Sequence, residues 1–129
     1  MWIMVVGPYT TGGADAATRT ERLAALNRAA LALFRRGHVP VIGVNMALPV
    51  IAVARGVMGE EPPPRPSPAT EKQDPFDEIM MPLSLALADR CDAVLRIGGA
   101  SAGADEEVER VRARGGHVYS SIDEVPDAD

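Results

Sequence analysis

The chain has little of two residue types on which several protein classes depend. Cys91 is its single cysteine, so one chain can form neither an internal disulfide nor a cysteine-based zinc cluster. Aromatic residues make up 4% of the sequence, so aliphatic side chains and alanine must fill most of the core. These absences exclude a small disulfide- or zinc-stapled scaffold and favour an ordinary hydrophobic core.

Basic residues are also too few to give the chain a positive net charge. There are 13 Lys and Arg against 18 Asp and Glu, which gives a formal net charge of −5. Nucleic acid polymers and anionic membranes bind clustered basic side chains, so both are disfavoured as partners. No apolar run approaches the roughly 20 residues that span a bilayer, and the first residues follow a strand pattern without a basic leader. We therefore expect a cytoplasmic protein that acts on a small molecule.

Common cofactor motifs are missing as well. The glycines of residues 7–13 do not follow the G-x-G-x-x-G order of a dinucleotide-binding turn, and no Lys-Ser or Lys-Thr pair follows a glycine loop. No set of His, Asp and Glu has the spacing of metal ligands. We therefore expect neither a cofactor nor a metal ion, which leaves carboxylate chemistry.

What the chain does have is a regular alternation of short apolar strands and helical patterns. The periodicity predicts strands at 2–6, 38–43, 92–97 and 117–120 and helices at 19–36, 46–57, 76–90 and 103–114. Pro40 cannot donate a ladder hydrogen bond, so the second strand is expected at a sheet edge. The alternation predicts one α/β domain over residues 1–129, a flavodoxin-like or Rossmann-like parallel sheet of four to five strands with helices on both faces.

One segment departs from this alternation. Residues 59–75 hold six prolines in 17 residues and few apolar side chains, which predicts an extended, mobile loop. A loop of this length in a compact domain is a lid, a binding loop or disordered, and composition does not choose among them. Simple disorder in the free protein is the favoured expectation.

Glycine and polar residues gather where the first and third predicted strands end. In open parallel sheets the ligand crevice lies outside the carboxyl ends of the strands, and the returning helices bring their amino ends there. His38, Cys91, Asp92 and His117 begin strands at the opposite edge, so structural roles are expected for them. The crevice is predicted to collect Gly7, Pro8, Tyr9, Asp77, Met81, Ser84, Ser101, Gly103 and Glu107.

Two interpretations of the turn at residues 101–107 remain open. Free N–H groups at a helix start attract anions, and glycines let a ligand approach the backbone, so this turn can hold a phosphate or a sugar hydroxyl. In the other interpretation Ser101 only caps the helix, and Asp105, Glu106 and Glu107 only complement its dipole.

Three short motifs occupy corresponding places in a known family. They are Gly7-Pro8-Tyr9 after the opening strand, an Asn27-containing first helix before a Gly-His-Val strand, and Ser101-x-Gly103-Ala104-x-x-Glu107. Together they resemble the nucleoside 2-deoxyribosyltransferase-like superfamily, in particular its small bacterial members. The resemblance covers most of the chain outside residues 59–75.

The resemblance implies a role for each matching residue. Glu107 would attack the anomeric carbon of a 2-deoxynucleoside, and a second base or water would resolve the glycosyl-enzyme, which is a retaining double displacement. Tyr9 would orient the carboxylate through its hydroxyl, and Ser101 would contact the substrate, near a 5′-phosphate in one branch of the family. The resemblance also implies a homodimer or larger homo-oligomer.

One position departs from the family pattern. Characterised relatives place an aspartate that acts on the nucleobase where this chain has Ser84. A serine can hydrogen-bond a base but cannot protonate it as it leaves, and Asp77, two helical turns earlier, is the candidate substitute. The departure keeps a second hypothesis open, a nucleotide-binding or sensing module without turnover, and a third, weaker one, a structural oligomerisation domain.

Overall fold

Four short parallel strands form the central layer of the protein. In the computed structural model, which describes residues 1–56 and 74–128, they are β1 (Trp2–Val6), β2 (Val39–Val41), β3 (Ala93–Arg96) and β4 (His117–Tyr119). Their order is β2-β1-β3-β4, and all three pairings are parallel. The predicted α/β class, with its Rossmann-like parallel sheet, is confirmed. So is the edge position of β2, where Pro40 needs no second neighbour.

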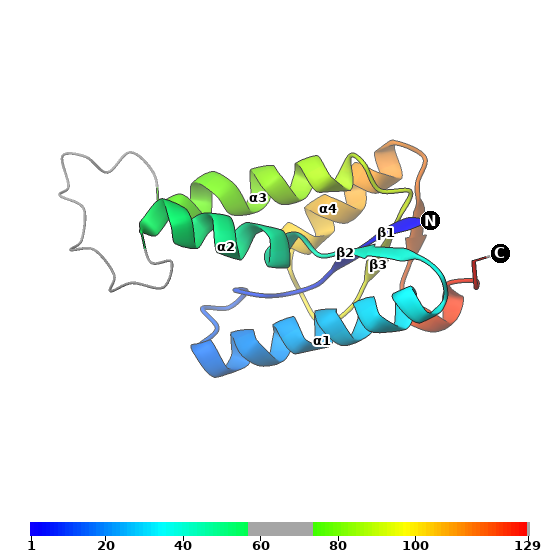
Figure 1. Ribbon diagram of the computed structural model, residues 1–129, viewed down its shortest axis with the longest axis horizontal. Coiled ribbons are helices and arrows are strands. Elements are labelled where there is room, and N and C mark those ends of the chain that lie inside the picture. Colours follow the sequence, from blue (N-terminus) through cyan, green and yellow to red (C-terminus); the bar gives the residue numbers. More distant parts are fainter. Residues whose placement is uncertain (57–73, 129) are drawn as a thin grey trace.

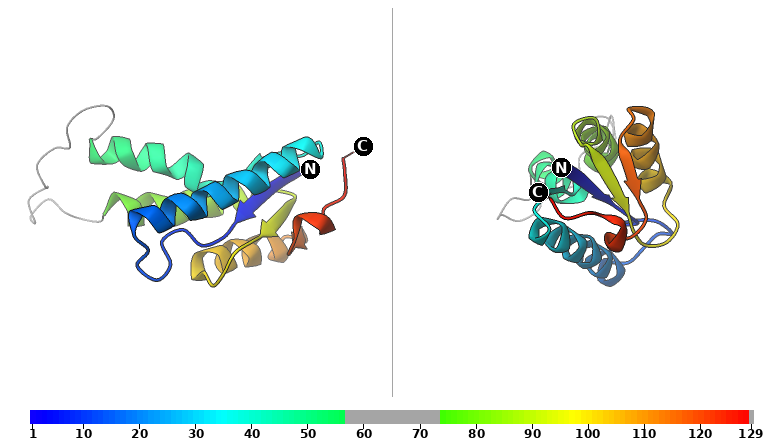
Figure 2. Two further views of the ribbon diagram at one scale, coloured as in Figure 1. Left: turned by 90° about the horizontal axis from the view of Figure 1, so that it is seen from below. Right: turned by 90° about the vertical axis from the view of Figure 1, so that its right-hand side faces the viewer.

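Helices cover both faces of this sheet (Figures 1 and 2). They are α1 (Ala16–Arg35), α2 (Gly43–Arg55), α3 (Pro75–Ala88) and α4 (Ala102–Ala113), followed by a short 3-10 turn, η1 (Ile122–Glu124). Side chains of β1 alternate between two cores because successive residues of a strand point to opposite faces. Ile3 and Val5 pack with Leu26 and Leu33 of α1, and the opposite core is formed by Met4, Val6, Val94, Ala88, Ala104, Val108 and Val111.

The helices α2 and α3 form a hairpin that projects past the carboxyl edge of the sheet (Figure 1). After β2 the chain continues outward as α2 and returns along it as α3. Ala47 and Ile51 pack against Met80 between the two helices, and Arg55 pairs with Asp74 at 2.8 Å near their outer ends. The first turn of α3 therefore lies beyond the sheet rather than at its edge.

Local capping explains two differences from the predicted helix boundaries. The carboxylate of Asp15 accepts a hydrogen bond from the Thr18 backbone N–H at 2.8 Å, so α1 begins three residues earlier than expected. Asp74 caps α3 in the same way, and Pro75 opens that helix instead of closing the predicted loop. The rest of the predicted 59–75 loop, residues 59–73, lies outside the described residues.

Residues at the strand beginnings hold the amino edge of the sheet together. His38 is 4% exposed, and its two ring nitrogens lie 2.9 Å from the Met1 amino group and 2.7 Å from the Pro126 carbonyl oxygen. The Asp92 carboxylate accepts a hydrogen bond from the Trp2 backbone N–H at 2.8 Å. These contacts agree with the structural roles expected for strand-start residues. None of the described helices combines the length and apolar character that crossing a membrane would require.

Candidate functional site

A cavity of about 230 Å³ opens at the carboxyl end of β1. The end of β1, the loop that follows it, and helices α1, α2, α3 and α4 all contribute to its wall. This is the crevice that parallel topology predicts, since the loops after neighbouring strands meet at one edge of the sheet. Most of the predicted site residues line it, namely Gly7, Tyr9, Met81, Ser84, Ser101, Gly103 and Glu107.

Two predicted site residues do not line this cavity. Pro8 packs against the loop after β3 instead, where a Cβ added at Gly98 would stand 2.8 Å from the Pro8 Cδ. Asp77 is exposed on the first turn of α3 and does not line the cavity, although its neighbour Phe76 does. Asp77 is therefore not positioned to take the place of the aspartate that the family pattern has where this chain has Ser84.

Sequence reasoning missed several residues of the wall. On α3 the cavity-facing stripe runs through Phe76, Met80 and Ser84 at four-residue spacing, with Met81 beside it. Helical spacing alone could have identified this stripe, because the predicted helix over residues 76–90 already began at Phe76. The other unpredicted lining residues are Val5, Val6, Thr10, Thr11, Leu26, Gly43, Val44 and Ala104, of which the threonines belong to the polar turn already predicted to face the crevice.

An arginine holds the loop that carries Tyr9. The Arg22 guanidinium, on α1, donates hydrogen bonds to the backbone carbonyl oxygens of Tyr9 at 3.1 Å and Thr11 at 2.9 Å. A planar guanidinium with several fixed donors suits such bridging between carbonyls. The cavity side of this loop is thus tied to the first helix.

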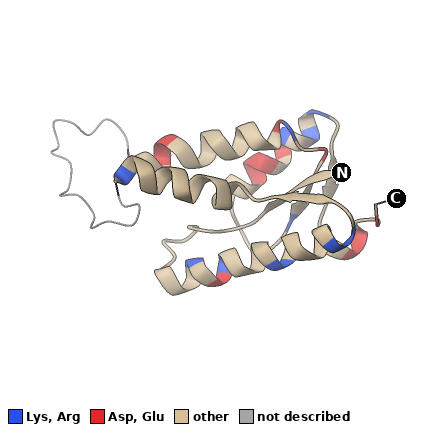
Figure 3. Cartoon of the chain, viewed as in Figure 1, with Lys and Arg blue, Asp and Glu red and all other residues tan. Residues whose placement is uncertain are grey.

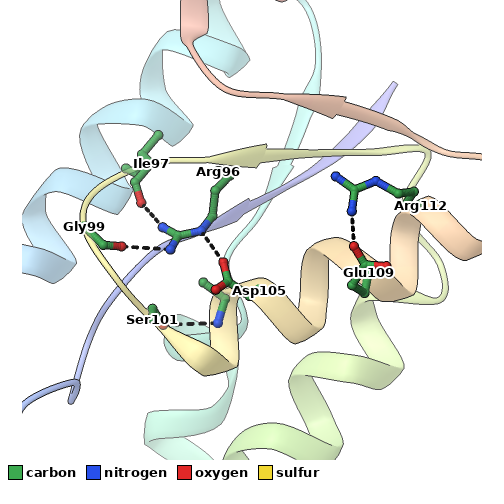
Figure 4. Close-up of polar contacts among 8 residues, drawn as sticks. Arg96, Ile97, Gly99, Ser101, Asp105, Glu109 and Arg112 are labelled. Carbon is green, nitrogen blue, oxygen red and sulfur yellow. Dashed lines mark hydrogen bonds and ion pairs between the residues drawn. The ribbon is translucent and has the colours of Figure 1, made fainter.

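A second arginine holds the loop between β3 and α4 (Figure 4). Arg96 donates to the carbonyl oxygens of Ile97 and Gly99, the latter at 2.8 Å, and pairs with Asp105 at 3.2 Å. Ser101 caps α4 by accepting a hydrogen bond from the Ala104 N–H at 3.1 Å, and it also lines the cavity. The capping interpretation of Ser101 and its place at the site therefore hold together.

Glu107 differs from the neighbouring acids of α4. Asp105 pairs with Arg96 and Glu109 with Arg112 (Figure 4), whereas the side chains of Glu106 and Glu107 have no hydrogen-bond or ion-pair partner among the described residues, and Glu106 is exposed. The Glu107 side chain faces the cavity. Its pKa is raised from 4.5 to about 7, chiefly by burial and to a lesser extent by the nearby Glu106 charge, while Arg96 acts in the opposite direction. A partly desolvated carboxyl group in a cavity is a candidate reactive group.

Comparisons of the chain with protein-family models, with curated proteins and with solved structures find no match. The chemistry of the site must therefore be inferred from the groups that line it. These are the Glu107 carboxyl, the Phe76 ring, the thioethers of two methionines, and the hydroxyls of Tyr9, Thr10, Thr11, Ser84 and Ser101.

The charged residues of α2 and α3 lie at the outer ends of these two helices (Figure 3). Arg55 is the single charged residue of α2 and stands at its far end. On α3 the charges are those of Asp77 and Glu78 in the first turn. Within residues 1–56 and 74–128, no three His, Cys, Asp or Glu side chains come together in a way that could hold a metal ion.

The close approach of α2 and α3 beside the cavity depends on Gly43. A Cβ at this position would lie 2.2 Å from the Ser84 Oγ and 2.9 Å from the Ser84 Cβ. We predict that Gly43→Ala lowers the free energy of unfolding by about 1–3 kcal/mol, because the added methyl overpacks a tight helix contact. Urea unfolding of the variant and the wild type measures this difference.

Gly99→Ala is the matched control for this substitution. A Cβ at Gly99 has no heavy atom within 4 Å, so the change should alter the stability by less than about 0.5 kcal/mol. Equal stability of the two variants would contradict the close packing of Gly43 on Ser84.

Proposed function

We propose that the protein is a member of the nucleoside 2-deoxyribosyltransferase-like superfamily. In this proposal it breaks N-glycosidic bonds of nucleosides or nucleotides, with Glu107 as the nucleophile. One observation carries the proposal: the Glu107 carboxyl and the Tyr9 phenol, which come from opposite ends of the chain, line the same cavity. The cavity of about 230 Å³ lies below the roughly 300–1,000 Å³ usual for drug-sized ligands. A ligand of nucleoside or nucleotide size fits this better than a dinucleotide.

The reaction would proceed in two displacements. A carboxylate oxygen of Glu107 bonds to the anomeric carbon while the C–N bond breaks and its electron pair goes to the base. Water, or the nitrogen of a second base, then attacks the same carbon and releases the carboxylate. Two inversions leave the anomeric configuration unchanged, and the step needs no cofactor.

Other groups in the wall have supporting roles in this proposal. The Tyr9 hydroxyl would orient the Glu107 carboxylate once substrate is bound, and the loop that carries Tyr9 is held in place by Arg22. Ser101 and the backbone at Gly103 contact the sugar or a 5′-phosphate near the start of α4, where unpaired N–H groups favour anions. Ser84 and Met81, on α3, face the base.

A second candidate is a nucleotide-binding module without turnover, and Ser84 favours it. This buried serine, 2% exposed, occupies the α3 wall where an acid would serve a leaving base. Free base released from a panel of deoxynucleosides and their 5′-monophosphates, followed by chromatography, distinguishes the two functions. Turnover supports the enzyme. Nucleotide binding by calorimetry without any base release would overturn it and leave the module.

The rate should follow the ionisation of Glu107. The nucleophile acts in its ionised form, so its pKa of about 7 predicts that kcat/KM rises as the pH passes upward through about 7 and then levels. The pH profile of base release between pH 5 and 9 measures this. A rate that falls across the same interval would contradict a nucleophilic Glu107 and indicate that this group acts as an acid.

A further inference from the structure

We propose that the cavity prefers substrates whose base is already a cation while bonded to the sugar, such as pyridinium nucleosides and N7-alkylated purine nucleosides. This inference rests on the proposed function and names its substrate class. It follows from the groups that face the cavity and from the charge that a departing base carries.

The first reason is the fate of the electron pair. When Glu107 bonds to the anomeric carbon, the pair of the broken C–N bond goes to the ring nitrogen of the base. A neutral purine or pyrimidine then leaves as an anion unless an acid protonates it, whereas a cationic base leaves as a neutral molecule. Water completes the reaction by attacking the anomeric carbon, losing a proton to solvent and freeing the Glu107 carboxylate.

The second reason is the chemistry of the α3 wall. Among the described residues that line the cavity, Glu107 supplies the only carboxyl group, and the proposed reaction uses it as the nucleophile. Of the α3 side chains that line the cavity, only Ser84 carries an O–H group, and a serine hydroxyl does not give up its proton at neutral pH. Asp77 is exposed and stands outside the cavity. A base that needs no proton suits this wall.

The third reason is that the same wall attracts a cation. Phe76 presents an aromatic ring, and the Met80 and Met81 thioethers are polarizable groups that stack well on planar rings. The Met81 sulfur sits close over α4, since a Cβ at Gly103 would be 3.2 Å from it. No Lys, Arg or His side chain lines the described part of the cavity, and a partly buried carboxylate such as Glu107 attracts a cation more strongly than an exposed one does.

A binding experiment tests the cation preference without turnover. The probes are 1-methylnicotinamide, a pyridinium cation, and 3-methylbenzamide, its neutral isostere, titrated by calorimetry at pH 8. The wild type should bind the cation at least about tenfold more tightly than the isostere. Glu107→Gln should remove that difference, whereas Glu106→Gln, which removes an exposed charge one residue away, should retain it. Equal affinities for the two probes in the wild type would overturn the proposal.

A turnover experiment separates this inference from the proposed function. Base release is measured from nicotinamide riboside and N7-methyl-2′-deoxyguanosine and from two neutral nucleosides, deoxyguanosine and deoxycytidine, with spontaneous release subtracted. The expected result is a kcat/KM at least about tenfold higher for the cationic pair. Neutral nucleosides cleaved equally well or better would overturn the preference and leave the proposed function standing. Release of no base from any of the four or from their 5′-monophosphates would overturn the proposed function, and this inference with it.

Discussion

The Glu107→Gln variant is expected to release free base at least about 10³-fold more slowly than the wild type. The amide keeps the size of the side chain but cannot form the glycosyl-enzyme bond, so the first displacement is lost. The fold and the affinity for neutral nucleosides should survive, because the Glu107 side chain makes no ion pair or hydrogen bond with another described residue. Base release under single-turnover conditions gives the rates, and calorimetry gives the affinities.

Glu106→Gln is the control for this experiment. It removes the same charge one residue earlier on α4, from an exposed side chain that does not line the cavity. Its rate should stay within a few-fold of the wild-type rate, since the effect of an exposed charge is small. Equal losses in both variants, or full activity in Glu107→Gln, would remove Glu107 from the mechanism.

Glu107→Gln is also expected to stabilise the protein at alkaline pH. The pKa of Glu107 is about 7 in the folded chain against 4.5 for the ordinary side chain, so the folded state holds this proton more tightly than the unfolded state. The resulting stabilisation is fully present below pH 4.5 and is lost as the pH rises through 7. The loss amounts to about 3 kcal/mol, and glutamine, which has no charged form, avoids it. The free energy of unfolding of Glu107→Gln should therefore exceed that of the wild type by about 2–3 kcal/mol at pH 8.

Urea unfolding at pH 5 and pH 8 measures this gain. The wild type should lose stability between the two pH values, and Glu107→Gln should lose much less. Glu106→Gln should follow the wild type. An identical pH dependence in the wild type and Glu107→Gln would show that the carboxyl group is well hydrated in the folded state. A confirmed gain would mean that the chain retains a destabilising group in its cavity, as functional sites commonly do.

Much of the fold was predictable because it depends on short-range patterns. Apolar runs of four or five residues that alternate with helical periodicity allow few arrangements other than a parallel sheet covered on both faces. Pro40 placed β2 at the edge because it lacks a donor. The meeting of Tyr9 and Glu107 was predictable for a topological reason, since the loops after adjacent parallel strands share one edge of the sheet.

The acidic helix start was only half interpretable from the sequence. The spacing of Ser101, Asp105 and Glu107 fits both a capped helix and a binding turn, and each acid is equally able to complement the helix dipole. The structure separates them, since Arg96 binds Asp105 while Glu107 faces the cavity. This distinction requires Arg96 to reach across from β3, a contact that no local spacing encodes.

The sequence alone determined which segments become strands and helices, which strand lies at the edge, and which loop ends face the crevice, because neighbouring residues decide these features. Tertiary structure alone decided which residues of α3 line the cavity. Phe76 and Met80 line it whereas Asp77 is exposed, and Gly43 leaves room for Ser84. Periodicity specifies the faces of a helix, but its position along the axis depends on packing between residues distant in the chain, as does the burial that raises the pKa of Glu107.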